Sequence, residues 1–195
     1  MKTQRFPFAL AVFALGLSPV ATPASTCSVK DKVPSSARTF AKADDQSAWR
    51  EYPHAGQAPD VQLDSGMSAQ VVQHKKVIPS VTIVKPGEDY WTYTRYCYGE
   101  TGQLEGVSFE IRTQLGWGYR VDGTAGGGGF SASTHEFFDT KNEKPIERPV
   151  GVANAPSSLQ PTMYMTVSEL PFAGLLKPVA KKNPGRHPGL SLLSK

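Results

Sequence analysis

The sequence contains few of the features by which many enzymes and membrane proteins are recognised. Its longest apolar run lies within residues 6–17, well short of the roughly 20 residues that a membrane-spanning helix requires. It has no GxSxG motif, which excludes the nucleophile elbow of the α/β-hydrolases. No Lys-Ser or Lys-Thr pair follows its four-glycine run, which excludes a P-loop, and no Cys-x-x-Cys is present to form a redox motif.

The N-terminal 24 residues have the organisation of a secretory signal peptide. Lys2 and Arg5 precede the apolar run, and small residues follow it up to Ala24. We therefore expect cleavage near Ala24 and a periplasmic or secreted protein. An uncleaved N-terminal anchor is the alternative interpretation.

Cysteine is scarce, with only Cys27 and Cys97 in the chain. In an oxidising compartment two cysteines most simply form one disulfide. The alternatives are a lipidated Cys27 beside a free Cys97, or two free thiols. The disulfide would tie the mature N-terminus to the centre of the chain.

Basic residues are concentrated at the two ends of the chain. Of the 21 Lys and Arg residues, two lie in residues 1–24 and five in residues 177–195, so residues 25–176 hold 14 basic against 17 acidic side chains, a net charge of −3. This balance argues against nucleic-acid binding by the folded part. We expect one β-rich domain over 25–176 and a disordered, Pro- and Gly-rich tail over 177–195, with peripheral membrane contact through the tail as one interpretation.

Strand patterns dominate the centre of the chain. Residues 90–98 are rich in Tyr and Thr, which favour a pleated surface. In residues 104–113, Val107, Phe109 and Ile111 alternate with polar side chains, a period of two that predicts one buried and one solvated face. A further strand is expected over 116–121. The fold class is therefore mainly β, with an antiparallel meander or partly closed barrel and one or two short helices.

The short helices are expected outside the central strands. Asp44 and Asp45 are candidate caps for a helix over Gln46–Glu51. Residues 130–138 are expected to form a short helix or an irregular turn, since the glycine run before them disfavours regular structure. Residues 162–167 are expected to form a final strand, with Ser168 capping a short helix that carries Leu175 and Leu176.

The position of Cys97 suggests which face of residues 90–98 is buried. Trp91, Tyr93 and Cys97 share one side of the strand, and a disulfide usually lies on the buried side. We therefore predict Trp91 and Tyr93 in the core, with Tyr90, Tyr96 and Tyr98 partly exposed.

Residues 135–139, His-Glu-Phe-Phe-Asp, resemble part of a zinc-protease helix. That motif requires a second His four residues after the first, and here the position is Asp139. We therefore predict no metal site, and no other cofactor. A hydrolase that uses His135 and Glu136 is kept as an alternative function.

The aromatic residues and arginines are the stronger candidates for function. Tyr98, Trp117, Tyr119 and Arg120 are expected near one another, beside the loop at residues 126–129, and residues of these types favour binding surfaces. The competing interpretation is that the aromatic side chains fill the core of a leucine-poor domain. We predict an exported binding module without catalysis, whose partner is an envelope protein or a glycan. An envelope inhibitor of a hydrolase such as lysozyme is the second alternative.

Overall fold

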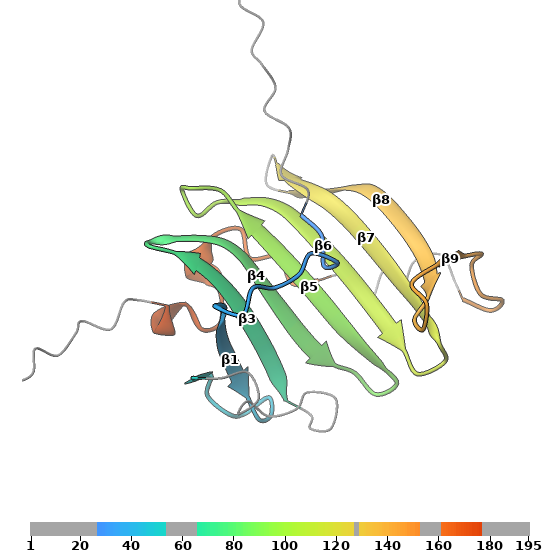
Figure 1. Ribbon diagram of the computed structural model, residues 1–195, viewed down its shortest axis with the longest axis horizontal. Helices are drawn as coiled ribbons and strands as arrows, with labels where there is room; N and C mark the ends of the chain where they lie inside the picture. Colours follow the sequence, from blue (N-terminus) through green and yellow to red (C-terminus); the bar gives the residue numbers. More distant parts are fainter. Residues whose placement is uncertain (1–26, 54–65, 127–128, 153–160, 177–195) are drawn as a thin grey trace, which may run out of the picture.

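The computed structural model describes residues 27–53, 66–126, 129–152 and 161–176. The expected signal peptide and basic tail, and residues 127–128 of the glycine-rich loop, lie outside the described residues. The chain forms one antiparallel sheet in which nearly every strand pairs with its neighbour in sequence (Figure 1). The strands are β1 (Arg38–Lys42), β2 (Arg50–Tyr52), β3 (Met67–His74), β4 (Val77–Pro86), β5 (Tyr90–Tyr98), β6 (Leu104–Thr113), β7 (Trp117–Gly126), β8 (Gly129–Asp139) and β9 (Pro145–Ile146).

The order of the strands makes the sheet a meander with two edges. β1 lies between β2 and β3, and from β3 to β9 the spatial order follows the sequence. β2 and β9 are the edge strands, so the sheet is not closed into a barrel. The predicted mainly β fold with an antiparallel meander is confirmed, and the helices of the described chain are limited to two 3-10 turns, η3 (Val167–Glu169) and η4 (Ala173–Leu175).

Each face of the sheet is covered by one end of the described chain (Figure 1). Residues 27–37 cross one face, which we call the N-terminal face. They are held there by the backbone N–H of Val29, which donates to Ser108 Oγ at 2.9 Å, and by Arg95, which donates to the Asp31 carbonyl at 2.9 Å. Residues 161–176 lie against the opposite face, the C-terminal face, where Tyr96 Oη donates to the Thr162 carbonyl at 2.7 Å.

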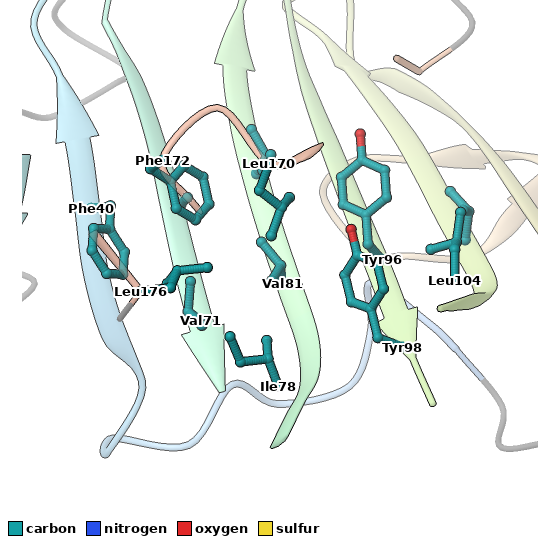
Figure 2. Packing of buried hydrophobic residues seen from close by; sticks show 13 residues of the cluster. Phe40, Val71, Ile78, Val81, Tyr96, Tyr98, Leu104, Leu170, Phe172 and Leu176 are labelled. Atoms are coloured by element: carbon teal, nitrogen blue, oxygen red, sulfur yellow. The ribbon is translucent and has the colours of Figure 1, made fainter. Parts of the chain in front are cut away.

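The hydrophobic core lies between the C-terminal face and residues 161–176. Figure 2 shows Leu170, Phe172 and Leu176 among the side chains of the sheet. The ring of Phe172 stacks on Phe40 with 5.1 Å between centroids. The core side chains from the strands are Phe40, Ala69, Val71, Ile78, Val81, Ile83, Tyr96, Tyr98, Leu104 and Val107. Their burial removes apolar surface from water, which is the main source of stability for a fold of this size.

The predicted orientation of β5 is wrong. Tyr96 and Tyr98 are buried, whereas Trp91 and Tyr93 are only half-buried. Cys97 lies on the N-terminal face, but residues 161–176 bring their apolar side chains to the C-terminal face. Leu170 and Phe172 thus decide which face of β5 is the core.

The prediction of a solvated face on β6 is also wrong. The period of two is present, but the polar side chains Ser108 and Glu110 are as buried as Val107 and Ile111. Residues 27–37 and a network of ion pairs cover them. The alternating pattern of β6 therefore assigns its side chains to the correct two faces, but it does not reveal that both faces are buried.

Several local predictions of secondary structure are wrong. Residues 130–138 belong to β8, because they pair with β7 along its length. The expected helix over Gln46–Glu51 is instead a turn, in which Asp44 Oδ1 accepts from the N–H groups of Gln46 and Ser47 and leads into β2. The expected strand over 162–167 is reduced to a single bridge between Gln103 and Thr166. Ser168 lies within η3, and η4, the turn that carries Leu175, has Phe172 at its N-cap.

Candidate functional site

A hollow of about 240 Å³ lies on the C-terminal face, between β3–β6 and residues 161–164. Its walls are contributed by alternate residues of the strands, which point to the same face of the sheet. The residues that line it are Met67, Ile83, Lys85, Pro86, Tyr90, Thr92, Thr94, Tyr96, Phe109, Pro161, Thr162 and Tyr164. The lining mixes apolar and aromatic side chains with hydroxyl groups and one ammonium group. Small-molecule sites also combine apolar walls with polar groups, although this volume is at the small end.

Tyrosine side chains connect the sheet to the segment that closes one side of the hollow. The rings of Tyr96 and Tyr164 meet edge to face, with 5.4 Å between centroids. Tyr98 Oη donates to the Tyr164 carbonyl at 3.3 Å, next to the bond from Tyr96 to Thr162. Burial raises the pKa of Tyr96, Tyr98 and Tyr164 above the ordinary value, so these hydroxyls remain neutral donors at physiological pH.

The polar side chains that line the hollow are hydroxyls and a single ammonium group. Thr92 and Thr94 lie on its floor, and Thr92 Oγ1 donates to the Lys85 carbonyl at 3.2 Å. Lys85 is exposed and is the one charged side chain among the lining residues. Tyr90 lies at the β4–β5 turn, where its ring packs over Gly87 so closely that a Cβ there would collide with it. A ligand with an apolar part and a negative charge close to it would complement the side chains that line the hollow.

The four residues predicted as a binding surface do not lie on one surface. Tyr98, Trp117 and Tyr119 share the C-terminal face, but Tyr98 pairs with Leu104 at one end of the sheet while Trp117 lies at the other end. Arg120 points to the N-terminal face, since it follows Tyr119 in β7. Tyr98, Tyr119 and Arg120 are all buried, and Trp117 is half-buried.

The buried Arg120 is the centre of an ion-pair network on the N-terminal face. Its Nε donates to Glu110 Oε2 at 2.6 Å, its Nη1 to Glu136 Oε1 at 2.7 Å and its Nη2 to Glu143 Oε2 at 3.2 Å. Arg112 also pairs with Glu110 and Glu143. All three nitrogens of the Arg120 guanidinium thus donate to carboxylates, which indicates a structural role.

The aromatic ring of Phe138 completes this network. The guanidinium carbons of Arg120 and Arg112 lie 4.4 and 5.5 Å from the centroid of the Phe138 ring. Gly118 lies beneath the ring, and a Cβ at this position would collide with it. The sequence pattern Gly-Tyr-Arg in β7 therefore has a packing explanation.

His135 and Glu136, the catalytic residues of the hydrolase alternative, point to opposite faces of β8 because they are consecutive in a strand. His135 is exposed. Glu136 accepts from Lys30 Nζ at 3.1 Å and from Arg120, and these bonds, led by that to Lys30, lower its pKa below the ordinary value. Glu136 is therefore held as a carboxylate within the ion-pair network.

The predicted bond between Cys27 and Cys97 is present, with 5.9 Å between the Cα atoms. Among the described residues, no group of three or more His, Cys, Asp and Glu side chains is placed to hold a metal ion. In the same part of the chain, no helix has the length and apolar character to span a membrane.

Sequence reasoning missed the hollow, although part of its signal was visible. The alternation Tyr90, Thr92, Thr94, Tyr96 puts aromatic and small polar side chains on one face of a strand. The remaining walls, such as Met67 and Pro161, come from segments that only the fold brings together. Comparison of the chain with protein families, curated proteins and solved structures found no match.

Proposed function

We propose that the protein is exported and binds a small aromatic or acyl anion in the hollow of the C-terminal face, without catalysing a reaction. The observation that carries the proposal is the hollow itself, whose wall combines aromatic and aliphatic side chains with three threonines and with Lys85 as its one charged side chain. The apolar part of such a ligand replaces water against these walls, and its negative charge is attracted to the Lys85 ammonium.

Export is supported by the disulfide and by the pattern of the N-terminal residues. Disulfides form and persist in oxidising compartments, so the bond between Cys27 and Cys97 is compatible with a periplasmic or secreted protein. Residues 1–24 have the composition of a signal peptide. Mass spectrometry of the mature chain tests the expected cleavage near Ala24.

The ligand proposal is tested with anilinonaphthalene sulfonate, an aromatic anion whose fluorescence rises when it enters an apolar site. The protein is purified with its disulfide intact and titrated with the dye. We expect saturable binding to the native protein. A Thr92→Phe substitution, which places a ring in the hollow, is expected to weaken binding at least about tenfold, and Lys85→Gln is expected to weaken it less.

Two matched controls show whether these effects come from the hollow. Ser131→Phe adds the same ring at an exposed position of β8 on the N-terminal face, and Lys141→Gln removes an exposed lysine far from the hollow. Both are expected to bind the dye like the native protein. Equal binding by the Thr92→Phe variant, or none by the native protein, would overturn the proposal. If the native protein and the Thr92→Phe variant inhibit lysozyme equally, the inhibitor function would be favoured instead.

A further inference from the structure

A second cavity, of about 270 Å³, lies on the N-terminal face beneath residues 31–34. It is separate from the hollow described above, because Ser80, Arg95 and Cys97 point to the face opposite Val81 and Tyr96. The disulfide between Cys27 and Cys97 holds the start of residues 27–37 on this face. The cavity therefore has the sheet as its floor and the N-terminal segment as part of its wall.

Arg95 lines this cavity as a buried cation without a carboxylate partner. Its side chain is only 8% exposed, yet none of the ion pairs among the described residues includes it. Its Nη1 donates to the Asp31 carbonyl at 2.9 Å, its Nη2 donates to Ser80 Oγ at 3.4 Å, and its buried Nε has no hydrogen-bond partner.

The contrast with Arg120 shows what is missing at Arg95. Arg120 is more deeply buried, but three carboxylates surround it. A buried charge without a partner is costly, since it loses its hydration and gains no ion pair. An anionic group bound in the cavity would supply the missing partner to Arg95.

Two carboxylates line the same cavity and narrow the class of ligand. Asp31 and Glu105 are exposed side chains of its wall, and the carboxylate of Glu105 lies against Gly99 at the β5–β6 turn. A simple anion would be attracted by Arg95 and repelled by both acids. A ligand that also carries an ammonium group satisfies all three charges. Val72 and Pro79 add apolar wall for a small side chain.

We propose that this cavity binds a small zwitterion of the α-amino-acid class, with its carboxylate at Arg95 and its ammonium group at Asp31 and Glu105. The assignment is independent of the hollow on the C-terminal face. Three probes of similar shape separate the contributions of the two charged groups. L-Leucine carries both, isocaproate carries only the carboxylate, and isoamylamine carries only the amine.

Isothermal titration of the native, disulfide-bonded protein is the test. We expect saturable binding of L-leucine, with isocaproate and isoamylamine each at least about tenfold weaker. Arg95→Met, which keeps an unbranched apolar stem and removes the guanidinium, is expected to abolish binding of leucine. Arg50→Met, at an exposed position of β2, is the matched control and is expected to bind like the native protein.

Glu105→Gln keeps the test decisive if Arg95→Met does not fold. Glu105 is exposed, so its substitution leaves the buried interior intact. The variant is expected to bind leucine at least about tenfold more weakly and to bind isocaproate unchanged, whereas Glu100→Gln at the neighbouring turn changes neither. The proposal is overturned if the native protein does not bind leucine, if isocaproate binds as tightly as leucine, or if Glu105→Gln leaves leucine binding unchanged.

Discussion

Replacing Arg120 with methionine tests whether this arginine serves the fold or a ligand. Methionine keeps an aliphatic side chain in the buried position, but it removes both the charge and the guanidinium carbon that lies 4.4 Å from the centroid of the Phe138 ring. Glu110, itself only 2% exposed, would then keep Arg112 as its one remaining ion-pair partner among the described residues. Breaking a buried ion pair by removing one partner costs about 3–5 kcal/mol. Because Arg112 remains, we expect a loss of about 3 kcal/mol.

The double variant Glu110→Leu/Arg120→Met separates the charge from the packing. With both charges gone, Arg112 retains Glu143 and Glu136 retains Lys30. We expect the stability of the double variant to return to within about 1 kcal/mol of the native protein, as apolar replacement of buried ion pairs often does. The coupling energy between the two positions is then about 2 kcal/mol or more, within the range for residues in one network.

Urea unfolding followed by tryptophan fluorescence measures these free energies, with the exposed Arg50→Met as the control for a surface position. A loss of less than about 0.5 kcal/mol for Arg120→Met is the size expected of a surface substitution and would refute the reasoning. A variant that folds with native stability but loses a ligand would instead support the binding role predicted from the sequence.

Reduction of the bond between Cys27 and Cys97, or replacement of both cysteines by serines, is expected to lower the free energy of unfolding by about 4 kcal/mol. The bond joins residues 70 positions apart and therefore closes a long loop in the unfolded chain. Urea unfolding with and without reductant measures the loss, and an unchanged midpoint would contradict it. Phe172→Ala is expected to cost about 3–5 kcal/mol, because the ring is almost fully buried in the core; a thermal scan that shows no loss would place the core elsewhere. The pKa of Glu136 is lowered by its bonds, first of all to Lys30, so the stability it contributes is present above its ordinary pKa near 4.5 and is lost as pH falls through the lower folded value. Glu136→Gln is therefore expected to flatten the acid limb of a plot of unfolding free energy against pH, and an identical limb would count against this bond.

Local patterns were sufficient to predict the class of fold and the chemistry of the cysteines. The alternation in β6 and the Tyr- and Thr-rich β5 identified an antiparallel meander, because side-chain period is a property of consecutive residues. Two cysteines in a chain with an export-like N-terminus predicted the disulfide that is present. Each of these inferences uses only neighbouring residues or composition.

The tertiary structure decided which faces are buried and where the cavities lie. Leu170 and Phe172 cover the face of Tyr96 from a distance of more than 70 residues along the chain, and no pattern within β5 reveals this contact. The residue type of Arg120 predicts a binding role, yet its guanidinium forms ion pairs with Glu110 and Glu136 from the neighbouring strands.

The region at residues 130–138 shows the same limit for secondary structure. The glycine run before this region weakens the local preference for a strand, and pairing with β7 makes β8. The same holds for the two proposed sites, whose walls combine strands with the ends of the described chain. The sequence by itself determined the class of fold, the central strands β5, β6 and β7 and the cysteine pair, whereas burial and the shape of a site depend on contacts between segments far apart in the chain, and these only the folded structure decides.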